Sequence, residues 1–360
     1  MQVTKMFKPF LLNSRCNILK DLPLSRPFHL WPRLFITCFI CFPLQISQAK
    51  ESATAMAETA RRLISLNDSE GQVKIAYEVE DESRQNWHFF PNWSDRTGIS
   101  LNHLSSEQRV CVEKLLELLL SSNALLEQED IRLIHGLKKN WDSPDNPRHL
   151  YFISIFGTPS TESTWGWRFE GHHLSLNCTL VGGKKFSVTP SFWGSSPTRV
   201  SKGEHKGMQV LGKEQSISLD LVNSLSAKQK EQALLSKSRG PEPTSRIFRE
   251  DYESNPGIPY QELKKEQQIQ LNDLILVFAE KYRPELIKQI DGRKKIIDPG
   301  SLKFSFQYSS KGYVSYFRII SNEYLIEFEN IGGNHVHAVW RDFDGDFGRD
   351  LIKEHHRKDH

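Results

Sequence analysis

The stretch NHVHAVWRDFDGDFG, residues 334–348, sorts its side chains by polarity onto the two faces of a predicted strand. Apolar residues at positions 336, 338 and 340 alternate with His335, His337 and Arg341. Successive side chains of a strand point to opposite faces, so the apolar set is predicted to pack into a core. The two imidazoles would share the other face, about 6.6–6.8 Å apart along the strand. Polar groups concentrated on one face of a hydrophobic strand indicate a functional site.

A second block, WGWRFEGHHLSLNCT at residues 165–179, has the same two-sided pattern with one interruption. Aromatic residues alternate with Arg168 and Glu170 before Gly171, and leucines alternate with His173 and further polar residues after it. The polar positions therefore change from even to odd numbers at Gly171. A β-bulge at this glycine would restore the alternation and place Arg168, Glu170 and His173 on one face with the polar residues that follow.

Periodicity and capping signals predict the remaining elements. Helices are predicted at residues 51–66, 110–120, 128–137, 226–235, 271–282 and 349–356. Strands are predicted at residues 87–93, 151–156, 186–192, 302–308, 314–316 and 324–328, with 335–341 as the last strand of an antiparallel meander. Residues 236–259 are predicted to be loop-rich. Because helices and strands are segregated along the chain, we predict an α+β fold, a single large domain with helices packed against a mainly antiparallel sheet.

The first 49 residues have the pattern of a secretory leader. Six Lys or Arg residues precede an apolar run at residues 34–44, and Ser47 and Ala49 supply the small residues of a cleavage site. The apolar run is shorter than the roughly 20 residues that a membrane span needs. We predict a signal peptide at residues 1–49, with an uncleaved N-terminal anchor as the alternative. The protein is then expected to be exported (periplasmic, secreted or on the cell surface), without stable membrane insertion once the leader is removed.

Charge and cysteine content exclude further classes. The leader carries six Lys or Arg against Asp21 alone, so the remainder has a net charge of −2 where the whole chain has +3. This balance excludes the basic surface of a nucleic-acid-binding protein and leaves a small-molecule or polymer substrate as the expected partner. Beyond the leader only Cys111 and Cys178 remain. They allow one disulfide, but their apolar surroundings favour two buried free thiols.

The histidines suggest a metal site. His335 and His337 can ligate one ion from a shared strand face, and His173 of the second block can supply a third nitrogen. Glu170 or Asp342 would then act as general base on a water bound to a divalent ion, whose identity the sequence does not specify. The chain contains no Gly-x-Ser-x-Gly elbow, His-Glu-x-x-His helix, P-loop or Gly-x-Gly-x-x-Gly turn. Among enzymes, the sequence therefore favours a metal-assisted hydrolase.

Three other interpretations of the residues in the two blocks stay open. The histidines could make ordinary hydrogen bonds on a half-exposed strand. Alternatively, Arg168, Arg341 and Trp167 could hold an anionic or carbohydrate ligand in a non-catalytic binding module, or the arginines could form ion pairs with neighbouring carboxylates. Further tryptophans, Trp87, Trp93 and Trp165, could line the same cleft, although core packing is the default for such residues.

The aspartates that follow the last strand invite a calcium interpretation. Their glycine, Gly345, comes too early for an EF-hand loop. We predict instead a turn in which Asp346 caps the last helix.

The two polar blocks are predicted to face each other across one pocket. Burying each polar face separately would leave more groups unpaired, at about 1–3 kcal/mol each. Convergence of His173 with His335 and His337 would favour the enzyme. Scattered histidines beside an aromatic shelf would favour the binding module.

The chain resembles the family of proteins of unknown function known as DUF3500. The resemblance rests on WGWRFEGHHLSLN (165–177), NHVHAVWRD (334–342) and DFG (346–348), with further similarity in YFISIFG (151–157) and after Trp87. It extends over about residues 60–356, with two departures: Cys178 replaces an expected aromatic residue, and residues 236–259 match loosely. The resemblance implies one domain and a secreted or cell-surface setting, and it implies no particular reaction.

Overall fold

A sheet of twelve strands organises the computed structural model, which describes residues 41–91, 94–137, 146–235 and 257–359. Its strands are β1 (Ala76–Tyr77), β2 (Ile99–Ser100), β3 (Tyr151–Phe156), β4 (Trp165–Gly171), β5 (Leu174–Val181), β6 (Lys185–Ser187), β7 (Ser191–Ser195), β8 (Ile258–Pro259), β9 (Lys303–Tyr308), β10 (Val314–Ile320), β11 (Tyr324–Ile331) and β12 (His335–Asp342). The described helices are α1 (Cys41–Ser65), α2 (Ser69–Ile75), α3 (Ser106–Leu119), α4 (Ser122–Gly136), α5 (Gly212–Ser224), α6 (Ala227–Ala233), α8 (Lys265–Ala279), α9 (Pro284–Lys294) and α10 (Arg349–Asp359). Short 3-10 turns include η1 (Glu82–Arg84) and η5 (Asp346–Gly348).

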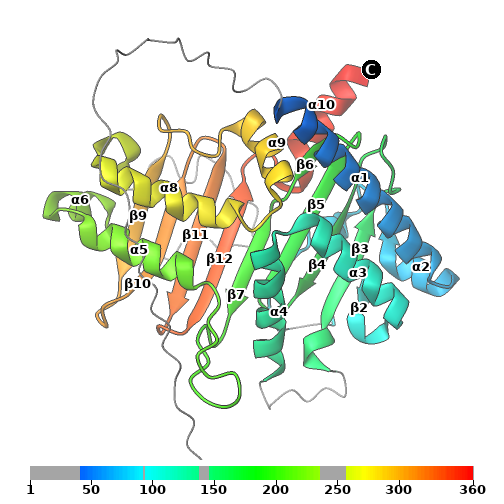
Figure 1. Cartoon of the computed structure of the whole chain (residues 1–360), viewed down its shortest axis with the longest axis horizontal. Coiled ribbons are helices and arrows are strands. Elements are labelled where there is room, and N and C mark those ends of the chain that lie inside the picture. The colour runs from blue at the N-terminus through cyan, green and yellow to red at the C-terminus, as the bar shows by residue number, and fades with distance from the viewer. Residues whose placement is uncertain (1–40, 92–93, 138–145, 236–256, 360) are drawn as a thin grey trace, which may run out of the picture. The chain divides into compact units, whose positions relative to one another are not determined.

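The strand order is β1-β3-β4-β5-β7-β12-β11-β10-β9-β8, with β2 beside β3 and β6 beside β5. Among these strand pairs only β1–β3 is parallel. Strands β1 to β7, from residues 76–195, form one half of the sheet, and β8 to β12, from residues 258–342, form the other. The halves therefore join where β7 pairs with β12, seen as neighbouring green and orange arrows in Figure 1. The predicted α+β fold with a mainly antiparallel sheet is confirmed.

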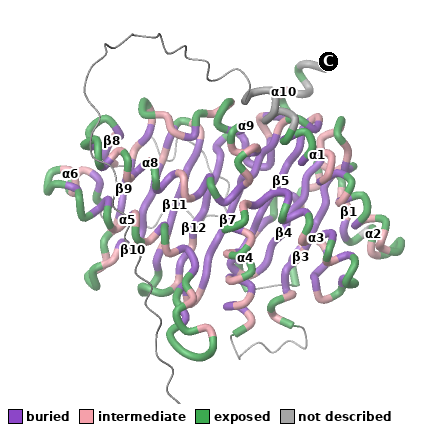
Figure 2. Tube along the Cα trace, viewed as in Figure 1, coloured by how far each residue is buried: buried purple, intermediate pink, exposed green. Residues whose placement is uncertain are grey.

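One face of the sheet is covered by helices. Helices α1, α3, α4, α5, α8 and α9 lie over the same side of the strands in Figure 1, and one hydrophobic core joins them to the sheet. The aromatic residues Trp165, Trp167 and Phe169 of β4 point into this core and are at most 1% exposed. Figure 2 shows that the strands are buried along most of their length, while exposed residues gather on the outer helix surfaces and turns. Alternation along the strands therefore leaves the polar side chains on the opposite face of the sheet.

Several local predictions are confirmed. Helix α3 begins with the predicted capping box of Ser105 and Gln108, and α6 with that of Ser226 and Gln229. The last four strands form the predicted antiparallel meander. Helices α2, α5 and α9 were not predicted, and the strand predicted at residues 186–192 is divided between β6 and β7. Both cysteines beyond the leader are buried and free.

The bulge predicted at Gly171 is wrong. Strands β4 and β5 form a hairpin with a regular ladder through Gly171, which pairs with Tyr151 on one side and Leu174 on the other. The turn consists of His172 and His173, and His173 adopts a left-handed φ of 65°. Such a turn pairs an even position with an odd one, which explains the change of polar parity without any extra residue. The predicted grouping of the polar side chains on one face is nevertheless correct.

The aromatic strand predicted at residues 87–93 is also wrong within its described part. The backbone of this segment bonds to side chains and to the β4–β5 turn rather than to a strand. Glu170 accepts from His88 N, and Arg96 donates to the carbonyls of His88 and Phe90. The backbone N–H of His173 donates to the Phe89 carbonyl at 3.0 Å. Trp87 and Phe89 then pack on the polar face of the sheet, in a cluster with Phe192, Val339 and Phe347.

The leader and the loop-rich segment fall largely outside the described residues. Residues 1–40 and 236–256 are not described, and neither are Trp93 and residues 138–145. The described ranges belong to one compact unit that begins at Cys41. Helix α1 covers both sides of the predicted cleavage point after Ala49. No helix within the described ranges is long and apolar enough to span a membrane.

Candidate metal centre

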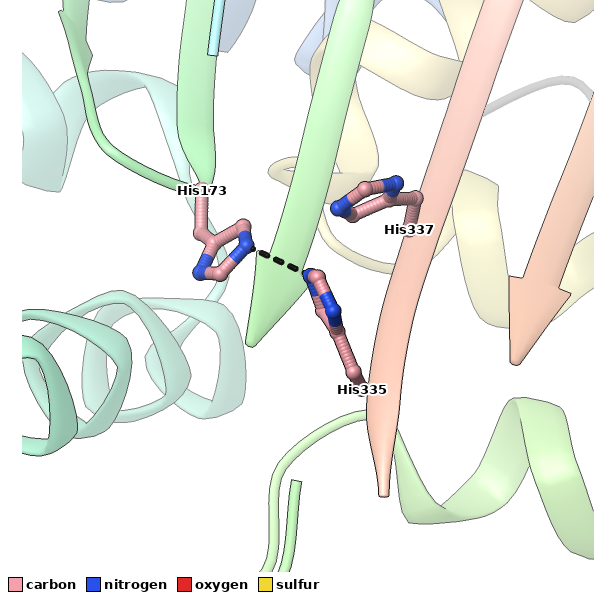
Figure 3. Close-up of side chains that lie close together, drawn as sticks. All are labelled: His173, His335 and His337. Carbon is pink, nitrogen blue, oxygen red and sulfur yellow. Dashed lines mark hydrogen bonds between the residues drawn. The ribbon is translucent and has the colours of Figure 1, made fainter. Parts of the chain in front are cut away.

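Three histidines from distant parts of the sequence converge beside the β7–β12 junction. His173 lies in the β4–β5 turn, whereas His335 and His337 lie on β12 (Figure 3). The Nε2 atoms of His173 and His335 are 3.0 Å apart and share a hydrogen bond whose direction depends on the tautomers of the two rings. One ring nitrogen of each histidine lies within 4.8 Å of the other two. The predicted convergence of these side chains is therefore present in the structure.

The sheet register brings the rings together across β7. Gly194 of β7 pairs with His337 of β12, and its backbone N–H donates to the carbonyl of His173 at 2.8 Å. A Cβ at position 194 would lie 3.2 Å from His173 Cδ2 and 2.8 Å from the carbonyl oxygen of Val336. The absence of a side chain at Gly194 thus opens the space in which His173 reaches the β12 histidines.

The surroundings of His337 are apolar on one side and acidic on the other. The rings of Phe89 and Phe192 lie 4.7 and 5.5 Å from the His337 ring, measured between centroids. Glu329 is the direct cross-strand partner of His337, and its Oε2 lies 3.6 Å from His337 Nδ1. The other ring nitrogen, His337 Nε2, is buried and has no hydrogen-bond partner. A buried nitrogen without a partner is costly, so this atom is a candidate metal ligand.

The nitrogen separations fit a shared ion. At metal–nitrogen distances of about 2.0–2.1 Å, two imidazole nitrogens on one ion are roughly 2.9–3.4 Å apart for bond angles near 90–110°. The 3.0 Å between His173 Nε2 and His335 Nε2 lies in that range. The third nitrogen lies within 4.8 Å, so a modest movement of its ring would complete the set. Three imidazoles are a known ligand set for zinc with one position left for water.

Glu170 was predicted as a general base and Arg168 as a ligand-binding residue. In the structure they belong to a buried ion-pair network. Both are fully buried, and Arg168 Nε lies 3.2 Å from Glu170 Oε1. Arg96 Nη1 lies 3.5 Å from the same oxygen, and Ser175 Oγ donates to Oε2 at 3.3 Å. Arg168 Nη1 donates to the carbonyls of residues 83 and 84. This network holds the segment before β2 against the sheet and pairs the Glu170 carboxylate with two buried arginines.

Arg341 and Asp342 lie at the far end of β12 and on opposite faces of the sheet. Arg341 is buried, donates from Nε to Asp346 Oδ2 at 2.7 Å and covers the Trp87 ring. Asp342 faces the helices, where its Oδ2 lies 2.6 Å from Lys294 Nζ. Burial raises the pKa of Asp342 to about 6, although Lys294 acts in the opposite direction. Neither residue accompanies the histidines.

Asp346 does not cap the last helix, contrary to prediction. It accepts from Asp342 N as well as from Arg341 Nε, so both its oxygens turn back to the end of β12. Phe347 follows with a left-handed φ of 59°, which changes the chain direction between Asp346 and α10.

Trp167 lies in the helix-side core, on the other face of the sheet from the histidines, and is 1% exposed. Trp87 and Trp165 are buried as well, so the described tryptophans form no open shelf. The two polar blocks thus share one sheet face with β7 between them, rather than facing each other across a pocket. Their histidines meet, while their arginines and carboxylates form separate networks.

Two residues of the site were missed at the sequence level. Gly194 is an isolated glycine in a strand, a signal of close approach by another group. Glu329 occupies a polar position that alternates with Ile326 and Phe328. Both patterns can be seen in the sequence, but neither indicates which distant strand pairs with β7 or β11.

The chain matches a known protein family. A family model described as "Protein of unknown function (DUF3500)" matches residues 49–349. No curated protein and no solved structure matches the chain.

Proposed function

The chain belongs to the DUF3500 family of proteins of unknown function, and we propose that His173, His335 and His337 bind a divalent transition-metal ion that promotes hydrolysis. One observation supports this proposal above all others. Ring nitrogens from strand β12 and from a hairpin turn at least 162 residues away lie within 4.8 Å of one another. In addition, His337 Nε2 is buried without a hydrogen-bond partner.

The chemistry follows from the ligand set. Three neutral imidazoles leave the charge of a divalent ion uncompensated and leave a coordination position open for water. An ion in such a site supplies Lewis-acid chemistry and lowers the pKa of bound water to about 7. The imidazoles would hold the ion, and Phe89 and Phe192 would limit the access of solvent to His337. The proposal does not use Glu170 or Asp342 as a base, because Arg168 and Lys294 hold their carboxylates elsewhere.

We also propose that the protein acts outside the cytoplasm. The basic and apolar order of residues 1–49 supports a leader. The family match begins at residue 49, where the leader is predicted to end. A small-molecule or polymer substrate would then be met in the periplasm, at the cell surface or in the medium.

The alternative, a non-catalytic module for an anionic or carbohydrate ligand, receives less support. It assigns the ligand contacts to Arg168, Arg341 and Trp167, and these side chains are at most 3% exposed. Buried side chains with internal partners offer little surface to an external ligand.

Metal titration tests the proposal. Full-length protein stripped with a chelator should bind one Zn²⁺ per chain in calorimetry, and His335→Ala and His337→Ala should abolish that binding. His103→Ala is the matched control, because His103 is exposed and lies outside the cluster. Absence of stoichiometric Zn²⁺ and Co²⁺ binding by the unaltered protein would overturn the metal site.

Hydrolysis is tested separately. The Zn²⁺-loaded protein should hydrolyse a simple activated ester or phosphate ester, lose that activity with the chelator and regain it when Zn²⁺ returns. Stoichiometric metal binding with no hydrolysis across ester, phosphate-ester and amide probes would leave the metal site standing and reject the hydrolase.

A further inference from the structure

Glu329 is the carboxylate placed directly beside the histidine cluster. It pairs with His337 across the β11–β12 ladder, so both side chains project from the same face of the sheet. The Glu329 Oε2 to His337 Nδ1 distance is 3.6 Å, which is within ion-pair range and longer than a hydrogen bond. The Glu329 side chain is 21% exposed and that of His337 12%. Both side chains are therefore partly exposed, the carboxylate more than the ring.

The two nitrogens of His337 have different surroundings. Nδ1 faces the Glu329 carboxylate, whereas Nε2 is buried without a hydrogen-bond partner. A neutral imidazole carries one proton, and a neighbouring carboxylate favours the tautomer that places this proton on the nitrogen facing it. The lone pair is then on Nε2, the atom that is otherwise unused.

We propose that Glu329 is a positioning residue of the metal centre: its carboxylate accepts the Nδ1 proton of His337 in a hydrogen bond and presents Nε2 to the ion. The inference rests on the proposed metal site and adds the residue that selects the tautomer and ring orientation of one ligand. The contact would shorten from 3.6 Å to hydrogen-bond length when the ion fixes the ring. The carboxylate would also offset part of the charge of an ion held by neutral ligands.

The affinity for Zn²⁺ provides the first test. Partners of metal-bound histidines typically contribute about 10–100-fold to metal affinity, so Glu329→Ala should weaken Zn²⁺ binding by that factor. Glu329→Gln keeps an acceptor oxygen of the same reach and should restore part of the lost affinity. Glu327→Gln is the matched control: Glu327 lies on the same strand and face, but it pairs with Val339 and accepts from Tyr316. This variant should bind Zn²⁺ like the unaltered protein.

A spectroscopic measurement separates positioning from a general effect on folding. In Co²⁺-substituted protein, each histidine bound through Nε2 gives one exchangeable, paramagnetically shifted Nδ1–H resonance. Glu329→Ala should speed the exchange of one such resonance with solvent and leave the others unchanged. Thermal melting of the metal-free variants reports on folding, and Glu329→Gln carries the test if Glu329→Ala is unfolded.

The possible failures are distinguishable. If the unaltered protein binds no metal, the proposed function fails and this inference fails with it. If the unaltered protein binds metal and the Glu329 variants match it in affinity and proton exchange, the metal site stands and the role of Glu329 is rejected. Equal losses of Zn²⁺ affinity in the Glu329 and Glu327 variants would also reject the role of Glu329. The loss would then follow from removing any carboxylate on this face of the sheet.

Discussion

His173 and His335 place their Nε2 atoms 3.0 Å apart although 162 residues separate them along the chain. They meet because β5 and β12 pair with the two edges of β7, so only β7 separates the β4–β5 turn from β12. The site therefore depends on the one junction that joins the N-terminal and C-terminal halves of the sheet. Anything that disturbs β7 at that point should disturb the site before it disturbs either half.

Gly194→Ala should reduce metal affinity at least tenfold and lower the free energy of unfolding by about 1–3 kcal/mol, the usual cost of overpacking. The added Cβ would meet the carbonyl oxygen of Val336 at 2.8 Å and His173 Cδ2 at 3.2 Å, which displaces the His173 ring. Zinc titration and urea unfolding measure the two effects. Gly292→Ala is the control, since nothing lies within 4 Å of a Cβ there. Unchanged affinity in Gly194→Ala would show that β7 does not control the position of His173.

Gly171→Val should destabilise the protein by at least about 1–3 kcal/mol. The cause is steric: a Cβ at position 171 would lie 2.4 Å from Tyr151 Cδ1 and 2.8 Å from the carbonyl oxygen of Leu150. Chemical denaturation measures the loss. Gly171→Val combined with Tyr151→Leu should recover part of it, because the smaller side chain removes the closest contact. A double variant no more stable than Gly171→Val would reject this explanation.

Glu170→Ala should lower the free energy of unfolding by about 3–5 kcal/mol, the usual effect of removing one partner of a buried ion pair. Arg168 and Arg96 would lose their shared carboxylate in a fully buried position. Glu162→Ala, at an exposed glutamate, should change stability by no more than about 0.5 kcal/mol. If Glu170→Ala instead abolished hydrolysis without loss of stability, Glu170 would be the catalytic base after all.

Stability should fall as pH rises from about 4.5 to about 7, in part because of Glu327. Burial raises the pKa of Glu327 from 4.5 to about 7, so the folded protein binds this proton more tightly than the unfolded chain. The contribution is fully present below pH 4.5 and is lost as the pH passes the folded value, with an upper limit of about 3 kcal/mol. Urea unfolding across this pH range measures it. Glu327→Gln cannot ionise and should show a shallower decline; an identical pH profile in both proteins would contradict the assignment.

Protein recovered from the exported fraction should begin at Lys50. The family match begins at Ala49. The basic residues, the apolar run and Ser47 of the predicted leader all precede it. N-terminal sequencing measures the start directly. A chain that still begins near Met1 in that fraction would favour the uncleaved anchor.

The alternation of residues along the strands is enough to exclude two of the predicted site residues. Trp167 neighbours Arg168, and Asp342 lies an odd number of positions from His337, so each falls on the opposite face of its strand. Both could have been rejected as partners of the histidines without a structure. The parity change at Gly171 likewise fitted a hairpin turn as well as a bulge, and the His172–His173 pair gave no turn signal because neither residue is glycine or asparagine.

The sequence by itself determined the two-sided strands, the capping boxes, the C-terminal meander and the shared face of β12 on which His335 and His337 lie. These follow from the backbone, whose alternation and capping bonds extend over only a few residues. Only the tertiary structure decided that β7 pairs with β12, that Glu329 lies beside His337 and that Glu170 is bound by arginines. Pairing between distant strands is set by the free energy of burying whole faces against the helices, a sum over many residues that no short stretch of sequence carries.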